Sequence, residues 1–331
     1  MNDCIIMNGN MIANSIKDNL RERVKALKEH GVSVGLGTLL IGNDPASISY
    51  VNSKHEDCRE IGIDSIRSEL PTNVTMNEAI AGVNAMNKDE NVTGFIMQLP
   101  LPAQLNTDAL IDEINPEKDA DGLTPYNLGS LTGNVNGDYN TPVPCTAAGV
   151  IRLLEAYDVR ITGRNICIIG RGLTAGRPLS LMLSNRNYNA TVDICHSQTW
   201  NLPYHVNNAD IIISCVGKPG FIDKGWFTGN KRPILINVGI SRVQDETGKY
   251  HIKGDFNPNC KEIASMYAPA AGGVGPMTRV MLLENVIRMA ERKLELINEV
   301  KTDNERSHDD IENVFNNITV STWSALDNLV K

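Results

Sequence analysis

Short apolar runs alternate with amphipathic helical segments along most of this chain, and this alternation limits the possible folds more than any other feature of the sequence. Apolar runs bounded by glycine are typical of buried strands, whereas apolar residues spaced three and four positions apart are typical of helices. Strands separated by helices pair in parallel, because the chain has to cross over from one strand to the next. The sequence therefore predicts an α/β fold built on parallel sheets.

The first series of alternating segments ends near residue 100. One of its helices has a clear start, because Asp44 can cap the first turn and Pro45 lacks the donor that would stay unpaired there. Thr75 and Glu78 have the spacing of a capping box, which opens another helix. In chain order we expect a helix at 10–30, a strand at 34–41, a helix at 44–62, a strand at 64–70, a helix at 75–86 and a strand at 92–99.

Residues 101–144 interrupt the alternation, because they are rich in proline, glycine, asparagine and aspartate. We expect a functional loop there, with only a short helix at 108–114. A second series then begins with a helix at 146–157 and ends with a helix from about Thr278. Its predicted strands lie at 165–169, 190–195, 210–216 and 234–238.

This organisation predicts two domains followed by an extension. The first would span 1–144 and the second would span 145–277. Residues 299–331 contain two short amphipathic stretches, which either dock on the body or on a partner subunit, or remain mobile. Their apolar positions are Ile311, Val314, Phe315 and Ile318, and then Trp323, Leu326 and Val330.

Composition narrows the classes of partner. The 331 residues include 31 basic and 39 acidic ones, a net charge of -8, which disfavours binding to nucleic acid or to anionic membranes. We see no apolar run long enough to span a bilayer. The seven cysteines are scattered and form no C-x-x-C pair, so we expect neither a disulfide framework nor a metal site. The cytoplasm is the expected location.

A glycine-rich turn marks a possible nucleotide site. The predicted strand at 165–169 runs into Gly170-Arg171-Gly172-Leu173-Thr174-Ala175-Gly176, which precedes a plausible helix. Such glycines let the backbone approach a pyrophosphate at the helix N-terminus. A tight strand-to-helix turn with no ligand explains the glycines equally well, but the turn lies within a βαβ series, which favours the nucleotide.

The end of the next strand bears on which dinucleotide binds. A cofactor without a 2′-phosphate is usually held there by an acidic residue, but the segment that includes His196 and Ser197 has none. Arg171 in the first turn favours a 2′-phosphate, so NADP is the expected cofactor. Asp193 argues against NADP, because it is an acidic residue in the same strand, although its mid-strand position makes contact with the ribose less favourable. A lone histidine such as His196 is more often structural or exposed than catalytic, so we predict no catalytic role for it.

Tyr50 and Lys54 are spaced i, i+4 on the predicted helix 44–62, so their side chains can meet. A pair of this kind is most often a solvated face or a packed stem rather than a catalytic site. The sequence around the pair changes that balance.

Five blocks of sequence, in order, resemble the bifunctional methylenetetrahydrofolate dehydrogenase/methenyltetrahydrofolate cyclohydrolase family, known as FolD-like. The first runs from Ile41 through Asn43-Asp44-Pro45-Ala46-Ser47 and Tyr50 to Lys54, Cys58 and Gly62. The others are Gln98-Leu99-Pro100-Leu101-Pro102, Pro116-Glu117-Lys118-Asp119-Ala120-Asp121-Gly122, Val216-Gly217-Lys218-Pro219-Gly220 and Gly272-Gly273-Val274-Gly275-Pro276-Met277-Thr278. The resemblance as a whole covers roughly residues 5–295.

The resemblance implies a fold and a set of residue roles. The fold is an N-terminal three-layer parallel-sheet domain that binds folate and is completed by the last helix, at about 278–298, followed by a Rossmann-type NADP-binding domain. The resemblance also implies a homodimer. Lys54 corresponds to the catalytic lysine, supported by Tyr50 and Gln98, and Asp121 to the carboxylate that grips the pterin. Further substrate contacts fall on Leu99, Pro100, Gly272, Gly273 and Pro276, and cofactor contacts on Gly170, Arg171, Gly172, Gly176, Ser197, Gly217, Ile240 and Thr278.

The implied activity has two steps. Hydride passes from 5,10-methylenetetrahydrofolate to NADP, and water then opens the methenyl product to 10-formyltetrahydrofolate, which places the chain in one-carbon metabolism and purine biosynthesis. The chain departs from the family pattern at Gly172, Ala147, Asn237 and Ala270-Ala271, mostly around the cofactor site. Two alternatives stay open: a dehydrogenase without cyclohydrolase activity, and a non-catalytic regulatory protein that binds folate or nucleotide.

Overall fold

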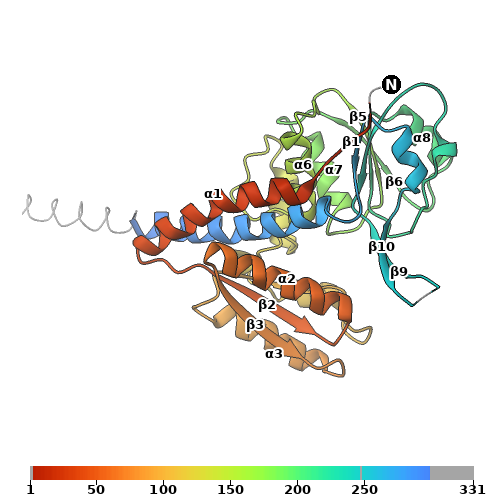
Figure 1. Ribbon diagram of the computed structural model, residues 1–331. Helices are drawn as coiled ribbons and strands as arrows, with labels where there is room; N and C mark the ends of the chain where they lie inside the picture. Colours follow the sequence, from red (N-terminus) through yellow and green to blue (C-terminus); the bar gives the residue numbers. More distant parts are fainter. Residues whose placement is uncertain (1–2, 247, 299–331) are drawn as a thin grey trace, which may run out of the picture. The chain divides into compact units, whose positions relative to one another are not determined.

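The computed structural model describes residues 3–246 and 248–298 (Figure 1). The chain divides into a large compact unit, residues 1–289, and a short unit that begins at Ala290. The strands of both predicted series lie in the large unit and form separate parallel sheets. The predicted amphipathic stretches between 311 and 330 lie outside the described residues.

The first sheet has three parallel strands in the order β3-β2-β4. Every residue of the central strand β2 (Gly35–Ile41) is buried, as its unbroken apolar run predicts. The flanking strands are β3 (Asp64–Leu70) and β4 (Gly94–Met97). Helices α2 (Pro45–Ile61) and α3 (Met76–Lys88) pack on β2, so the sheet is the core of the first domain.

Helix α2 begins and ends where its capping residues predict. The Asp44 carboxylate accepts a hydrogen bond from the Ser47 N–H at 2.8 Å, and Pro45 occupies the first turn. Gly62 ends the helix with a φ of 86°, a conformation that side chains other than glycine rarely adopt. These caps fix the register of α2 and therefore the direction in which Lys54 points.

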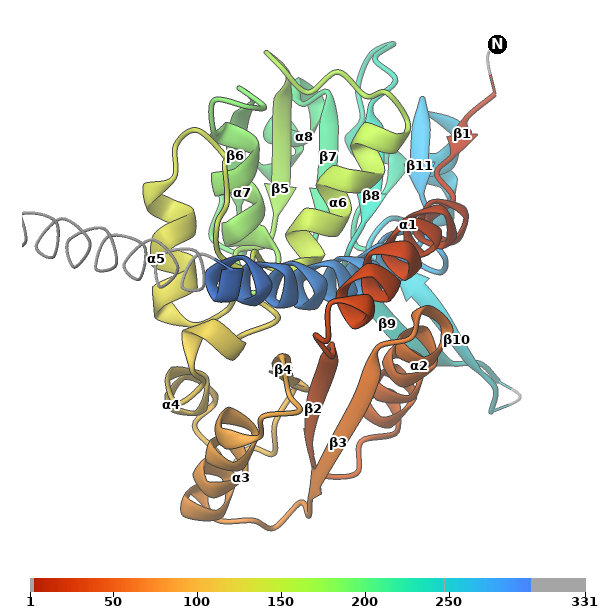
Figure 2. The ribbon, with the colours of Figure 1, turned by 90° about the vertical axis from the view of Figure 1, so that its left-hand side faces the viewer.

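Helix α1 (Gly9–Glu29) packs against α2 of the first domain and against α6 (Cys145–Ala156) of the second. Both views show α1 passing between the two sheets (Figure 2). The stripe of apolar residues read from the sequence faces inward, since Leu20, Val24 and Leu27 are buried.

The segment 101–144 holds more structure than the sequence led us to expect. Besides α4 (Thr107–Asp112), which matches the predicted short helix, it contains the 3₁₀ turn η1 (Pro116–Lys118) and helix α5 (Pro125–Gly133). The prediction of a loop through α5 was wrong. Thr124 caps that helix and Pro125 starts it, a signal that the surrounding glycines and asparagines obscured.

The second sheet has six parallel strands in the order β1-β11-β8-β7-β5-β6. Residues near the chain start, β1 (Ile5–Ile6), pair with β11 (Met266–Ala268) and so belong to this sheet. The predicted strands appear as β5 (Asn165–Ile169), β6 (Thr191–Cys195), β7 (Ile211–Ser214) and β8 (Ile234–Asn237). Helices α6, α7 (Gly176–Ser184) and α8 (Leu202–Asn208) accompany them.

Several smaller elements were not predicted. An antiparallel hairpin, β9 (Ile240–Gln244) and β10 (Tyr250–Gly254), extends from this domain (Figure 1). Two 3₁₀ turns, η2 (Lys224–Trp226) and η3 (Pro258–Glu262), connect the later strands. These elements are short and carry weak periodicity, which is why helix α8, the hairpin and β11 went unseen.

The last helix spans residues 274–298 and starts earlier than predicted. Gly275 and Pro276 suggested a loop up to Thr278, but proline is tolerated in the first turn of a helix because the donor it lacks would be unpaired there. Val280, Leu283 and Ile287 are buried, as their spacing predicts. Within the described residues, we find no helix both long and apolar enough to cross a bilayer.

Candidate active site

Lys54, on helix α2, lies at the centre of a cluster of buried polar side chains. Its side-chain amine donates a hydrogen bond to Gln98 Oε1 at 3.0 Å and lies 4.6 Å from the centre of the Tyr50 ring. Tyr50 and Lys54 meet because they are spaced i, i+4 on α2. Gln98 reaches them from the end of strand β4. Only 7% of Lys54 is exposed, so its environment rather than solvent sets its protonation.

Gln98 is oriented by the backbone of the next residue. Its side-chain Nε2 donates to the Leu99 carbonyl at 2.6 Å, which turns the amide oxygen toward Lys54. Gln98 follows directly after β4, and its backbone N–H donates to the carbonyl of Leu39 in β2. The peptide bond from Leu99 to Pro100 is cis. The sheet therefore fixes the acceptor that faces the amine.

Burial lowers the pKa of the Lys54 amine from 10.5 to about 8, against the opposing effect of the Asp121 carboxylate. Burial raises the pKa of Asp121, and the charge of Lys54 acts in the other direction. Burial also raises the pKa of the Tyr50 phenol, which stays neutral at physiological pH. The centre thus holds an amine that can gain and lose a proton near neutrality.

Asp121 is held at the start of helix α6. Its carboxylate interacts with the backbone and side chain of Cys145, the first residue of that helix, whose preceding residue Pro144 offers no side-chain cap. A carboxylate at this position satisfies helix N–H groups and is favoured by the helix dipole. Asp121 is therefore oriented before any ligand arrives.

Two buried residues that the sequence did not single out hold the segment before Asp121. Asp119 accepts hydrogen bonds from the Thr124 N–H at 2.8 Å and from the Asn127 side chain at 2.9 Å. Asn285, on the last helix, donates to the carbonyls of Ala120 and Val143, each at 2.9 Å. Asn285 lies 165 positions from Ala120 in the chain, so no local pattern could have pointed to this contact.

The glycine-rich turn has the shape that a dinucleotide requires. A Cβ on Gly176 would lie 2.2 Å from the Gly170 carbonyl oxygen, so the turn is packed backbone against backbone. Helix α7 starts at Gly176 without a side-chain cap at Ala175, which leaves its first turn suited to a phosphate. Gly172 differs, because a Cβ there would meet nothing within 4 Å. The turn therefore fits the pyrophosphate of NADP.

The neighbouring strand end lies beside this turn. The Gly170 N–H donates to the Cys195 carbonyl at 2.8 Å, and Ser197 follows two residues later. Arg171 and Ser197 are both exposed, as residues that await a ligand phosphate should be. Asp193 pairs with His205 of helix α8 at 2.9 Å, so its carboxylate has a partner within the protein.

A second loop of predicted cofactor residues is organised by Asp255, which the sequence did not single out. This buried carboxylate accepts hydrogen bonds from the N–H groups of Val216 and Lys218, at 2.9 and 2.7 Å. Gly217 between them has a φ of 66°, and its carbonyl accepts from the Ser241 hydroxyl next to Ile240. The structure thus brings Gly217 and Ile240 together.

The remaining predicted residues lie around the start of the last helix. The Gly272 carbonyl accepts a hydrogen bond from the Gly9 N–H at 2.8 Å, and a Cβ on Gly273 would lie 2.2 Å from the Pro269 oxygen. Thr278 donates to Val274 within its own helix. Three positions after Pro276, Arg279 contacts helix α2 through Asp57, which connects this segment to the helix that carries Lys54.

Two of the departures from the family pattern have clear structural surroundings. Asn237 is buried and donates to the Ala268 carbonyl at 2.9 Å, so it joins β8 to β11. Ala147 is fully buried in α6. Both residues are accommodated without disturbing the glycine-rich turn.

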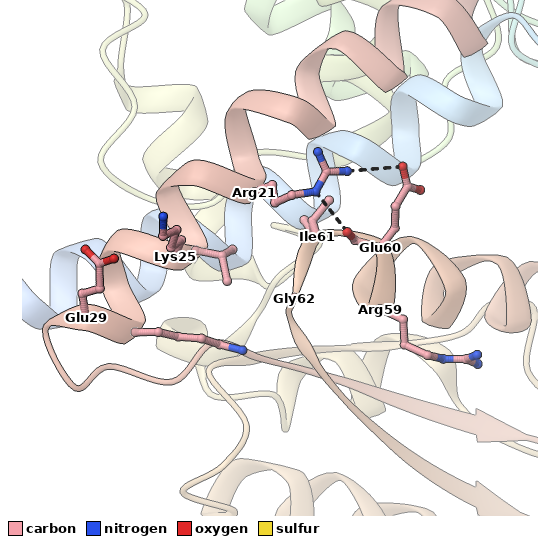
Figure 3. Close-up of a pocket in the computed structure, with 9 residues that line it drawn as sticks. Arg21, Lys25, Glu29, Arg59, Glu60, Ile61 and Gly62 are labelled. Carbon is pink, nitrogen blue, oxygen red and sulfur yellow. Dashed lines mark hydrogen bonds and ion pairs between the residues drawn. The ribbon is translucent and has the colours of Figure 1, made fainter.

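A hollow of about 520 Å³ between α1 and α2 is distinct from this centre (Figure 3). Arg21, Lys25, Lys28 and Arg59 contribute positive charge to its lining, which does not include Lys54. Arg21 is tied to the carbonyl and carboxylate of Glu60. We assign no ligand to this hollow. Among the described residues, no cluster of His, Cys, Asp and Glu is arranged to hold a metal ion.

Comparison with known proteins identifies the family. The model of the tetrahydrofolate dehydrogenase/cyclohydrolase catalytic domain matches residues 7–121, and the model of the NAD(P)-binding domain of the same enzymes matches residues 144–294. A solved bifunctional FolD methylenetetrahydrofolate dehydrogenase/cyclohydrolase from Campylobacter jejuni is 36% identical, over 88% of this chain and 99% of its own, with a TM-score of 0.81. The chain belongs to the tetrahydrofolate dehydrogenase/cyclohydrolase family.

Other members of the family agree. The Trypanosoma brucei FolD enzyme, solved with NADP cofactor and an inhibitor, is 34% identical over 89% of this chain and 99% of its own, with a TM-score of 0.82. A 5,10-methylenetetrahydrofolate dehydrogenase from the silkworm Bombyx mori is 30% identical over 88% and 99%, with a TM-score of 0.79. The predicted family, α/β fold, enzyme class and NADP cofactor are confirmed.

Proposed function

We propose that Lys54 is the general base and acid of this methylenetetrahydrofolate dehydrogenase/cyclohydrolase, with Gln98 and Tyr50 orienting it and Asp121 holding the pterin. The observation that carries this assignment is the buried Lys54 amine, which hydrogen-bonds Gln98 at 3.0 Å and has a pKa of about 8. A buried amine that titrates near neutrality suits proton transfer at physiological pH.

In the first step, hydride leaves the one-carbon bridge of 5,10-methylenetetrahydrofolate. Bound NADP supplies the hydride acceptor, and the residues around Gly170, Gly176 and Ser197 would hold it. The substrate nitrogens stabilise the methenyl cation that forms, so the protein acts mainly by placing the bridge correctly. Asp121 contributes by accepting two N–H donors from the aminopyrimidinone ring, a pairing with fixed geometry.

In the second step, water adds to the methenyl carbon and a carbon–nitrogen bond opens to give 10-formyltetrahydrofolate. The neutral Lys54 amine takes a proton from the attacking water, and the resulting ammonium returns that proton to the departing nitrogen. The second proton of the water is lost to solvent as the formyl C=O forms, which balances the positive charge of the methenyl cation. The cationic substrate favours the neutral amine by charge repulsion. Gln98 accepts a hydrogen bond from the amine in either state, which keeps Lys54 in place through both transfers.

The assignment is tested by Lys54→Met, which keeps most of the length of the side chain and removes the amine. We expect hydrolysis of supplied methenyltetrahydrofolate to fall to the spontaneous rate, while NADP binding, followed by fluorescence, stays unchanged. Hydrolysis at the wild-type rate in this variant would remove Lys54 from the mechanism. Gln98→Ala serves as the graded companion, since it should weaken hydrolysis about ten- to a hundred-fold by freeing the amine.

We also propose that the chain acts in the cytoplasm as a homodimer and supplies one-carbon units to purine biosynthesis. The seven cysteines are free thiols, which suits a reducing compartment. Residues 1–144, completed by the helix at about 278–298, would form the folate domain, and 145–277 the cofactor domain. Analytical ultracentrifugation of the full chain measures the oligomeric state directly.

A further inference from the structure

Asp57, one turn beyond Lys54 on helix α2, forms ion pairs with two basic residues of other helices. One oxygen of Asp57 accepts a hydrogen bond from the Lys17 amine of α1 at 2.5 Å, and the other lies 2.7 Å from Arg279 Nε on the last helix. Only 7% of the Asp57 side chain and 9% of the Lys17 side chain are exposed. Three helices therefore meet at a single buried carboxylate.

The partners of Asp57 differ in their surroundings. Lys17 has a second acidic partner, Glu60, at 2.7 Å, and this carboxylate is about half exposed. Arg279 pairs with Asp57, and the contact is an ion pair rather than an aligned hydrogen bond. About a quarter of the Arg279 side chain is exposed, so the guanidinium would have solvent to move into if Asp57 released it.

Asp57 lies three positions after Lys54 on α2, so the two side chains share one side of the helix and the ion pair holds Arg279 on the side of Lys54. Burial is the main cause of the lowered pKa of Lys54, and Arg279 lowers that pKa further. Asp121 from the loop, and Cys145 of α6 and Cys58 of α2 in their thiolate forms, act on Lys54 in the opposite direction. Arg279 is thus the cation among these neighbours, and the last helix holds it at a fixed place.

We propose that Arg279, held by Asp57, is a positioning residue that keeps the Lys54 amine available as a base during hydrolysis. The inference rests on the proposed role of Lys54. The guanidinium stays charged at every physiological pH, so it biases the proton on its neighbour without exchanging one itself. Asp57 acts through Arg279, because it anchors the guanidinium against helix α2 on the side of Lys54.

The test is the pH dependence of cyclohydrolase activity in the intact enzyme, from about pH 6 to about pH 10, with spontaneous hydrolysis subtracted. Arg279→Met should move the rising limb to higher pH by about half a unit, the size expected for one charge that solvent screens, since about a quarter of the Arg279 side chain is exposed. The rate at neutral pH should then fall about three-fold, while the high-pH plateau is retained. Arg279→Lys should keep the wild-type profile.

Asp57→Asn separates positioning from simple charge removal. If Asp57 holds Arg279, the released guanidinium moves into solvent, and the limb shifts to higher pH as in Arg279→Met. Loss of a nearby negative charge alone would lower the pKa of Lys54 and shift the limb to lower pH. The control is Glu60→Gln, which removes the other partner of Lys17 and should leave the limb in place.

The outcomes distinguish this inference from the role of Lys54 itself. A limb that persists in Lys54→Met contradicts the proposed function. A limb that depends on Lys54 but stays unmoved in Arg279→Met, or moves to lower pH in Asp57→Asn, overturns the inference alone. Thermal unfolding of each variant identifies loss of folding, and Arg279→Gln, which keeps a polar side chain, replaces Arg279→Met if the latter does not fold.

Discussion

The two ligand sites of this chain are built from different materials. The folate centre consists of charged and polar side chains removed from water, with Lys54 hydrogen-bonded to Gln98 and Asp121 seated at the start of α6. The cofactor turn consists of backbone, with Gly170 and Gly176 in close contact and Arg171 exposed. The folate centre depends on the protonation of buried side chains, and the cofactor turn depends on the space that its glycines leave for a ligand.

This difference decides which measurements report on each site. A buried charge costs free energy, so the folate centre should reveal itself in the pH dependence of stability and activity. A close-packed turn carries no titrating group, so it should respond to added volume instead. A change of charge should therefore affect mainly the folate centre, and a change of side-chain volume should affect mainly the cofactor turn.

The largest expected effect is on stability at the folate centre. Unfolded Lys54 keeps its proton up to pH 10.5, whereas the folded amine loses it near pH 8. Between these values the unfolded chain binds more protons, so stability rises with pH, by up to about 3 kcal/mol from this group. Urea unfolding of wild type and Lys54→Met at several pH values should show this rise in the wild type alone. Parallel curves for the two proteins would mean that the amine is not desolvated.

The next effect is on volume at the cofactor turn. In Gly176→Ala the added carbon would lie 2.2 Å from the Gly170 oxygen, and because both atoms belong to the backbone the turn has to open. Overpacking of this kind costs about 1–3 kcal/mol, so the KM for NADP should rise about ten- to a hundred-fold. Hydrolysis of supplied methenyltetrahydrofolate, which needs no cofactor, should stay within about two-fold of the wild type by the same reasoning.

Gly172→Ala is the matched control for that change. A Cβ at Gly172 meets nothing within 4 Å, so dehydrogenase kinetics should be unaltered. Equal losses in both variants would show that the turn is sensitive to any side chain rather than to the contact between Gly170 and Gly176.

Sequence signals were sufficient where local rules decide the structure. The capping residue Asp44 and the terminal Gly62 gave the bounds of α2, and the i, i+4 spacing of Tyr50 and Lys54 predicted the contact that the structure shows at 4.6 Å. The glycine-rich turn was also placed correctly between β5 and α7. Each of these features depends on residues within a few positions of one another.

Contacts between distant segments could not be read in the same way. Asn285 supports the segment before Asp121, and Arg279 meets Asp57, only because the last helix packs beside segments far away in the chain. The pairing of β1 with β11 has the same origin. Polar residues on a mostly apolar helix have several possible partners, and tertiary packing selects among them.

The smallest expected effect concerns Asp193, whose position opposed the prediction of NADP. The structure pairs it with His205 at 2.9 Å, and the carboxylate raises the pKa of that histidine. A raised histidine pKa stabilises the fold at low pH, and the benefit disappears as pH rises through the folded pKa. Both side chains are partly exposed, so Asp193→Asn should cost at most about 0.5 kcal/mol, and only at acidic pH. The ratio of kcat/KM for NADP over NAD should stay within about two-fold of the wild type, because Asp193 lies in the middle of β6 and its carboxylate pairs with His205. A larger change in that ratio would place Asp193 at the cofactor and reverse the contrast between a charged folate centre and a backbone cofactor turn.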